Sequence, residues 1–268
     1  MPTSTPEEVH GDVRYLAGSP GRIAILRTLR EEPLRPAEIT RRVDSTRTTV
    51  QRVLAGFRER CWVCERNATY RLTPTGEQVV DAYEELLGAA ERAREFAPLA
   101  SHLTSLPGGP PPEAFASGEL TVATSSDPLA PVEALLDRFA DAEGGHVRSI
   151  SPIVTRTFNE AAMDLLETGT SIELLIDERV LETSAEEFPS DLERALQRED
   201  VTVAVHPDRL SAGLLAFEGT TCVVAYDDAN ALRAMLVCED EPAVAEWASE
   251  WFERVWNESE PIEAAVEE

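Results

Sequence analysis

A proline-rich segment in the middle of the chain divides it into two parts. Residues 106–112 read Leu-Pro-Gly-Gly-Pro-Pro-Pro, and proline can neither donate a backbone hydrogen bond nor continue a helix. Such a segment forms a semi-rigid connector. A length of 268 residues is also typical of roughly two domains. The sequence therefore predicts a first domain over residues 1–104, a linker over 105–117 and a second domain over 118–268.

Charge is distributed unevenly along the chain. The whole chain has a formal net charge of −26, with 24 basic and 50 acidic residues, and every basic residue is an arginine. Between Arg22 and Arg71, in contrast, twelve arginines stand against six acidic residues. A cationic region in a strongly anionic protein is expected where the chain meets a polyanion. The helix pattern of this region, described below, makes double-stranded DNA the favoured partner.

The acidity of the remaining chain has two explanations. Molar salt shortens the Debye length to about 3 Å, so a halophilic cytoplasm tolerates a highly charged surface. A GC-rich genome would also favour arginine over lysine codons in an ordinary acidic protein. We expect a cytoplasmic setting, because Met1 to Asp12 lacks the regions of a signal peptide. Four unevenly spaced cysteines fit a reducing compartment, and no uncharged apolar run approaches the ~20 residues of a membrane span.

Three short helices are predicted in the basic region. The first runs from Arg22 to Arg30, after a Ser19-Pro20 start. The second begins at Pro36 and ends at Val43, and the third runs from about Thr46 to Arg60. Apolar residues at helical spacing form the buried stripe of the third helix: Val50, Val53, Leu54 and Phe57. Helices two and three, joined by a tight turn, are typical of a helix-turn-helix.

The opposite face of the third helix carries residue types that suit a DNA groove. They are Thr46, Arg47, Thr48, Gln51 and Arg52. Arginine can pair with guanine through two hydrogen bonds, and glutamine with adenine. Two strands then follow, Trp62 to Glu65 and Ala68 to Leu72, around a turn at Arg66-Asn67. A solvated arginine-rich helix is the alternative interpretation.

These elements, with the exit Leu72-Thr-Pro-Thr-Gly76, resemble the archaeal and bacterial winged helix-turn-helix regulators over about Arg14 to Tyr83. The resemblance implies that the third helix enters the major groove. It also implies that the hairpin, or wing, touches the DNA backbone or minor groove through Arg66.

Cys61 and Cys64 form a Cys-x-x-Cys pair, which can be a redox pair or half of a zinc site. Cys222 and Cys238 stand alone inside predicted strands, so no second pair completes a tetrahedral site. We expect structural or incidental cysteines, with a thiol redox sensor through Cys61 and Cys64 as the alternative.

One long helix is predicted from Gln78 to Leu103. Its apolar residues recur at alternating steps of four and three: Val79, Tyr83, Leu86, Ala90, Ala93 and Ala97. Such a seam suits pairing with a second copy, because helix-turn-helix proteins usually read two half-sites through twofold symmetry. Packing against the chain's own domains is the alternative.

Strands and helices alternate in the second domain. Four strands are predicted, at Leu120–Ser125, His146–Ser151, Ser171–Ile176 and Val201–Val205. The predicted helices between them are Pro128–Ala142, Thr157–Glu167 and Ser190–Arg198. Three further strands and a last helix follow: Gly213–Glu218, Thr221–Tyr226, Ala231–Cys238 and Glu241–Asn257. Alternation implies parallel pairing, so we predict an α+β winged helix-turn-helix domain followed by an α/β domain with a mixed, helix-flanked sheet.

The second domain also resembles a known family. Gly213-Leu-Leu-Ala-Phe-Glu218, Val223 to Tyr226 and Glu241 to Pro261 are similar to the effector domain of archaeal winged-helix regulators, both TrmB-like regulators and haloarchaeal relatives of the methanogenesis filament regulators. The resemblance implies a sensor sheet, related to phospholipase-D-like domains, that controls a DNA-binding unit. A chain without lysine lacks the His-x-Lys motif of phospholipase D, so hydrolysis does not follow.

No catalytic, metal or cofactor site is predicted. The four histidines are scattered without metal-ligand spacing, and the G-x-S-x-G, P-loop and dinucleotide motifs are absent from the sequence.

A small-molecule effector is expected at the C-terminal ends of the strands, where ligands bind in open α/β sheets. The predicted pocket rim consists of Asp127, Arg148, Ser151, Asp177 and His206. Arg148 and Arg156 could hold an anionic metabolite. Helix caps and loop positions are the alternative for each residue, and a protein-interaction or dimerisation module is the alternative for the domain.

Overall fold

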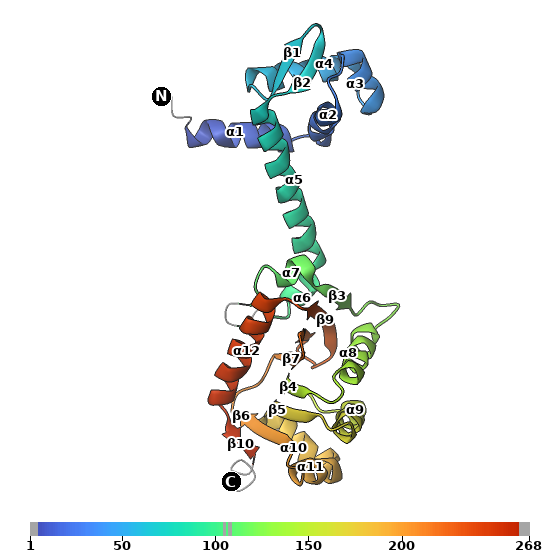
Figure 1. Cartoon of the computed structure of the whole chain (residues 1–268), viewed down its shortest axis with the longest axis vertical. Helices are drawn as coiled ribbons and strands as arrows, with labels where there is room; N and C mark the ends of the chain where they lie inside the picture. The colour runs from blue at the N-terminus through green and yellow to red at the C-terminus, as the bar shows by residue number, and fades with distance from the viewer. Residues whose placement is uncertain (1–4, 104–105, 107–108, 263–268) are drawn as a thin grey trace. The chain divides into compact units, whose positions relative to one another are not determined.

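The structure of the chain is a computed structural model that describes residues 5–103, 106 and 109–262. It forms two compact units, Met1–Glu91 and Arg92–Glu268 (Figure 1). The division falls inside a helix, α5 (Pro74–Glu95). It lies earlier than the expected boundary at 104/105, because Phe96, Leu99 and Leu103 are buried in the core of the second unit.

The expected linker, 105–117, is not a free connector throughout. Residues 105, 107 and 108 lie outside the described part of the chain. Ala114 is fully buried in the second unit's core, and α7 (Ala114–Ser117) begins with it. The last part of the linker is therefore part of the folded second unit.

The first unit begins with α1 (Pro6–Ala17), a helix that the sequence analysis did not predict. Its start is held by a capping box. The Thr5 hydroxyl accepts a hydrogen bond from the Glu8 N–H, and the Glu8 carboxylate accepts one from the Thr5 N–H at 2.8 Å. Leu16 is its buried residue, whereas Val9 and Val13 are about half exposed.

The three predicted helices of the basic region are confirmed as α2 (Pro20–Glu31), α3 (Pro36–Arg42) and α4 (Arg47–Glu59). The predicted stripe of α4 is buried in their common core. Two antiparallel strands follow, β1 (Val63–Arg66) and β2 (Thr69–Leu72), and an isolated bridge joins Leu34 to Tyr70 of β2.

The hairpin turn lies one residue later than predicted. Asn67 and Ala68 occupy the turn with φ of 52° and 60°, the left-handed region that asparagine tolerates better than most residues. Arg66 is instead the last residue of β1, opposite Thr69.

The prediction of one helix from Gln78 to Leu103 was wrong. α5 ends at Glu95, and a short helix, α6 (Ala97–Ala100), follows Phe96. Pro98 lacks the N–H that a continuing helix would need, and Phe96 turns into the core of the second unit. Among the described residues, no helix combines the length and apolar character needed to cross a bilayer.

The second unit is built on one mixed sheet of eight strands, in the order β10-β6-β5-β4-β7-β8-β9-β3. The strands are β3 (Glu119–Val122), β4 (His146–Ile150), β5 (Ser171–Asp177), β6 (Val201–His206), β7 (Ala212–Phe217), β8 (Thr220–Tyr226), β9 (Leu232–Glu239) and β10 (Glu260–Pro261). Parallel pairing is confirmed for β4, β5 and β6. It was wrong for β3, which pairs antiparallel with β9 at the edge, because β7 occupies the other side of β4.

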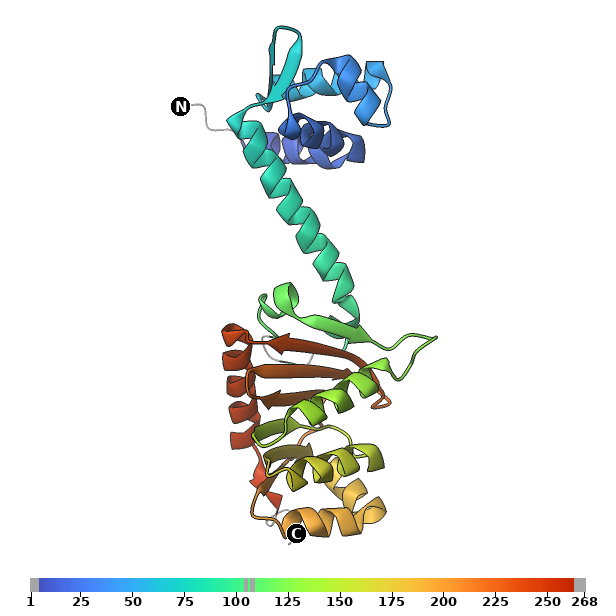
Figure 2. The same ribbon diagram turned by 45° about the vertical axis from the view of Figure 1, so that its right-hand side comes forward.

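Helices cover both faces of this sheet (Figure 2). One face carries four helices: α8 (Ala130–Asp141), α9 (Arg156–Glu167), α10 (Glu178–Glu187) and α11 (Pro189–Leu196). The other face carries α12 (Pro242–Asn257), whose Val244, Ala248 and Phe252 pack in one core with Leu99 of α6. The sequence predicted a mixed, helix-flanked sheet, and this arrangement is confirmed, although α10 was not predicted.

Gly76 should tolerate no side chain. A Cβ there would lie 2.0 Å from the carbonyl oxygen of Trp62, so Gly76→Ala should cost about 1–3 kcal/mol of unfolding free energy. The matched control is Gly11→Ala in α1, where no atom lies within 4 Å of the added Cβ, and a gain of up to about 1 kcal/mol is expected. Urea unfolding of the full chain measures both. Equal effects of the two substitutions would contradict this packing.

Candidate nucleic-acid interface and internal cavity

The arginines of the first unit fall into two groups. Those of the first group form ion pairs at the surface: Arg27 and Arg30 with Glu84, Arg42 with Glu32, Arg58 with Glu65, and Arg60 with Asp12. Exposed pairs of this kind contribute little stability, about 0–1 kcal/mol each. Their main effect here is to neutralise arginines within the chain.

The second group has no carboxylate within ion-pair distance among the residues that the structure describes. Its members are Arg14, Arg22, Arg35, Arg41, Arg47, Arg52, Arg66 and Arg71. Arg14 and Arg22 belong to α1 and α2, and Arg22 donates to the Tyr15 carbonyl. The other six lie at or on α3, α4 and the β1–β2 hairpin. In a chain of net charge −26, these cations are available to an external anion.

The predicted reading face of α4 is exposed. Thr46 caps the helix, and its hydroxyl accepts a hydrogen bond from the Thr49 N–H at 3.2 Å. The five predicted residues of this face are all exposed: Thr46, Arg47, Thr48, Gln51 and Arg52. Arg66 is exposed as well, on β1 beside the turn. The structure thus brings the predicted α4 residues to one surface and leaves Arg66 on the hairpin.

The four cysteines are free thiols. Cys61 is exposed with a φ of 59°, and the Arg71 Nε lies 3.3 Å from the Cys64 Sγ. Burial raises the pKa of Cys222 to about 12 and that of Cys238 to about 11, so both stay protonated. Within the described part of the chain, no group of three or more His, Cys, Asp or Glu residues is placed to hold a metal ion.

Asp177, one of the predicted rim residues, is a buried structural carboxylate. Its side chain is 1% exposed. One oxygen accepts a hydrogen bond from the Val180 N–H at 2.9 Å, and the other accepts one from the Leu210 N–H at 3.0 Å. It therefore caps α10 and holds the loop between β6 and β7.

Arg148 is likewise committed within the chain. Its guanidinium lies 2.8 Å from the Glu173 carboxylate, donates to the Ser249 hydroxyl at 3.2 Å and stacks over the Phe252 ring. These partners place it on the sheet face covered by α12, whereas Arg156 is exposed at the start of α9.

The remaining predicted rim residues are not gathered into one site. Asp127 is exposed in the loop after β3, at the far edge of the sheet. The His206 ring nitrogen Nδ1 lies 3.0 Å from the Asp208 backbone nitrogen. Ser151 donates to the Ile153 carbonyl at 2.7 Å and borders a partly open cavity. Of the five predicted residues, Ser151 alone lines that cavity.

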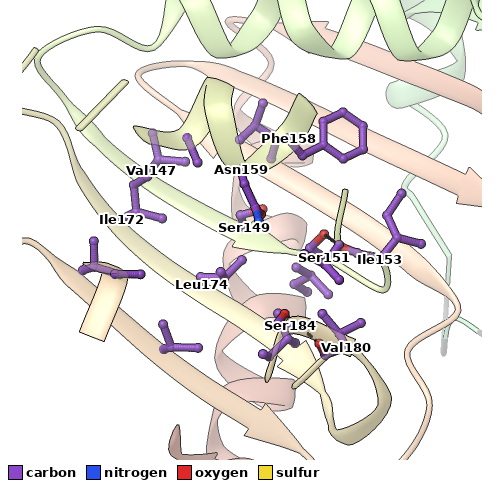
Figure 3. A pocket seen from close by; sticks show the side chains of 18 of the residues that line it. Val147, Ser149, Ser151, Ile153, Phe158, Asn159, Ile172, Leu174, Val180 and Ser184 are labelled. Atoms are coloured by element: carbon purple, nitrogen blue, oxygen red, sulfur yellow. Dashed lines mark hydrogen bonds between the residues drawn. The ribbon is translucent and has the colours of Figure 1, made fainter. Parts of the chain in front are cut away.

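The cavity measures about 160 Å³ and lies between the sheet and helices α8–α11 (Figure 3). Strands β4, β5 and β6 form much of its floor, and Phe158 and Asn159 of α9 and Val180 and Ser184 of α10 border it. The sequence analysis missed it, because its apolar lining repeats at the same spacing as an ordinary core face. Residues such as Met163 of α9 and Leu174 of β5 therefore give no sequence signal of a hollow.

Two family models match the chain over the units described above. Residues 10–95 match the HVO_A0261 N-terminal domain, and residues 128–258 match the middle domain of FilR1, a methanogenesis regulatory protein. The chain is an archaeal transcriptional regulator. More narrowly, it belongs with those that join an HVO_A0261-type N-terminal domain to a FilR1-type middle domain.

Several solved structures are similar to the chain. One is TrmBL2, an archaeal chromatin protein, with 13% sequence identity and a TM-score of 0.43; the match covers 90% of this chain and 94% of TrmBL2. Nuc from Salmonella typhimurium, a phospholipase D family member, has 13% identity and a TM-score of 0.42, over 54% of this chain and 98% of its own. NucT from Helicobacter pylori has 10% identity and a TM-score of 0.43, over 54% and 98%. At these scores the likenesses carry no conclusion about function. No curated protein matches the sequence.

Replacing Asp177 by alanine should destabilise the second unit. Two buried N–H groups lose their acceptor, which costs about 1–3 kcal/mol. The matched control, Asp127→Ala, removes an exposed carboxylate and should change the free energy of unfolding by less than about 0.5 kcal/mol. Chemical unfolding of the full chain compares them. A stability loss at Asp127 as large as that at Asp177 would contradict the structural role.

Proposed function

We propose that the chain regulates transcription by binding double-stranded DNA through its first unit, a winged helix-turn-helix domain. The observation that carries this proposal is the separation of the arginines into paired and unpaired groups. Six of the eight unpaired arginines lie at α3, α4 and the hairpin, the elements that meet DNA in helix-turn-helix proteins. The paired arginines are Arg27 and Arg30 of α2, Arg42 and Arg58 near the ends of α3 and α4, and Arg60 just after α4.

In this proposal α4 is the recognition helix. Arg47, Gln51 and Arg52 read base edges in the major groove, where arginine pairs with guanine and glutamine with adenine. Thr46 and Thr48 bind phosphates, and Arg66 on the hairpin, the wing, binds the backbone or minor groove. Phosphate contacts position the protein without specifying sequence. The setting we propose is the cytoplasm of a halophilic archaeon, in which salt screens the acidic surface.

We further propose that the chain is a homodimer paired through α5. Val79 and Tyr83 at its start pack against the first unit's core, but Leu86 is 56% exposed, and Ala90 and Ala93 are exposed as well. The three residues follow one another along the predicted seam, and contiguous exposed apolar residues mark an interaction site. Twofold symmetry would present two copies of α4 to two half-sites.

The second unit acts, in this proposal, as a sensor that binds a small molecule without turning it over. The cavity between the sheet and α8–α11 is the proposed effector site. It replaces the rim first predicted, because Asp177 and Arg148 are committed to internal contacts. An effector that changes DNA affinity would do so by about 1–3 kcal/mol, and DNA would change effector affinity by the same factor.

Arg52→Ala should reduce the preference for specific DNA by about 5- to 150-fold, equivalent to the 1–3 kcal/mol of a bidentate base contact. The control is Arg27→Ala, an arginine already paired with Glu84 at 3.0 Å, which should leave DNA binding unchanged. Duplexes selected from a random pool by the natural chain, and unselected duplexes, are titrated with each protein at fixed salt. Arg66→Ala should weaken binding to both kinds of duplex alike. Unchanged binding by Arg52→Ala would refute the role of α4.

Leu86→Glu should separate the dimer and weaken DNA binding together, since a charge would be buried in the interface. Leu129→Glu is the matched control, because Leu129 of the second unit is exposed to nearly the same extent, 58%. Sedimentation equilibrium at micromolar concentration measures the mass of each protein. A monomeric natural chain, or a dimer that survives Leu86→Glu, would exclude pairing through α5.

A further inference from the structure

The wall of the second unit's cavity is unusual for a central sheet. Leu174 lies in β5, between β4 and β6, yet its side chain is only half-buried, and Met163 of the overlying α9 is half-buried too. Both line the cavity. Helices α9, α10 and α11 thus leave apolar surface uncovered where a sheet and its helices normally pack closely.

The size of the cavity limits its occupant. A volume of about 160 Å³ is close to that of an engineered apolar cavity of about 150 Å³ that binds benzene. A hexose in such a space would bury several hydroxyls without partners, and each unpaired buried hydroxyl costs at least about 1–3 kcal/mol. The apolar lining therefore selects against sugars.

Charge limits the occupant further. Among the described residues that line the cavity there is no Arg, Lys or His. Asp191 is the one ionisable carboxyl in the lining, and hydrogen bonds from Arg194 and Asn159 hold its pKa below the ordinary value. Asp191 is already paired with Arg194, which lies outside the lining, so a phosphate or carboxylate would find no cationic side chain among the lining residues. A neutral occupant fits instead.

A few polar groups remain available to orient that occupant. The hydroxyls of Ser151 and Ser184 already donate to backbone carbonyls, those of Ile153 and Val180, at 2.7 Å each. In the described part of the chain, the hydroxyls of Ser149 on β4 and Tyr226 on β8 have no hydrogen-bond partner, and both residues line the cavity. Burial raises the pKa of Tyr226, which therefore stays neutral.

We propose, on the basis of the sensing role inferred above, that this cavity binds a neutral, ring-sized and mostly apolar molecule with one hydroxyl group, which hydrogen-bonds to Ser149. The apolar lining contributes most of the affinity, and Ser149 contributes selectivity for the hydroxyl. Tyr226 is the second hydroxyl that can face the occupant.

Phenol and toluene test this class, because they have nearly the same shape and differ by a hydroxyl in place of a methyl group. Isothermal titration of the full chain should show saturable binding of both and tighter binding of phenol. Ser149→Ala should reduce the preference for phenol by about two- to twelvefold, the range that one neutral hydrogen bond supports. Toluene affinity should stay within about twofold. Glucose 6-phosphate should not bind.

Two neighbouring alanines of α9 provide a matched pair for the location. Ala162 lines the cavity and Ala161 does not. Ala162→Leu adds three carbons where there is free space and should weaken both aromatic probes at least about tenfold, whereas Ala161→Leu should not. Thermal unfolding checks that both variants fold. If Ala162→Leu is unfolded, the Ser149→Ala comparison, in the intact cavity, still decides.

The outcomes separate the ligand class from the sensing role. Absence of saturable phenol binding, or binding unaffected by Ser149→Ala and Ala162→Leu, overturns the proposed class. A second outcome also overturns the proposed class: glucose 6-phosphate binds, phenol does not, and Ala162→Leu blocks the binding. The sensing role would then stand. In a third outcome, phenol binds with the predicted effects of the variants but does not change DNA affinity. This result supports the ligand class and overturns the coupling proposed for the second unit.

Discussion

Strand β4 is the element on which the second unit depends, because both halves of the sheet are joined to it. It pairs parallel with β5 on one side and antiparallel with β7 on the other. Its side chains alternate between the two layers: Val147 is buried beneath α8 and α9, and Ile150 is buried beneath α12. Ser149 shares the face of Val147, and both line the cavity. The strand that holds the sheet together therefore also carries the proposed contact to an effector.

In the first unit, the acidic residues determine which arginines remain available. Glu84 binds both Arg27 and Arg30, Asp81 also binds Arg30, and Glu65 of the hairpin binds Arg58. Where carboxylates are as abundant as in this chain, an unpaired arginine needs an acid-free neighbourhood. On α4, Arg47 and Arg52 have no carboxylate of the described residues within ion-pair distance. An excess of acid thus concentrates the remaining positive charge at the elements proposed to bind DNA.

Helical spacing and turn residues predicted individual helices and strands well. They did not predict features that depend on contacts between residues far apart in the sequence. The stripe of α4 was readable because Val50 and Phe57 recur at helical spacing. The capping box of Thr5 and Glu8 and the Asp177 cap could have predicted α1 and α10, and Pro98 could have predicted the end of α5. The sequence could not show that Arg148 pairs with Glu173, or that helices leave a hollow over β5, because an apolar residue facing a cavity and one facing a neighbour belong to the same pattern.

The contact at Gly76 has a mechanical consequence. The Trp62 carbonyl accepts a hydrogen bond from the Thr73 N–H at 3.0 Å, and its backbone leaves no room for a Cβ on Gly76. The Trp62 ring in turn packs 5.7 Å from that of Phe57, in α4. The first turn of α5 therefore packs directly against the Trp62 backbone, and Trp62 packs against the end of α4. A rotation of the first turn of α5 is therefore expected to displace the Trp62 backbone, and with it the ring that packs on Phe57 of α4.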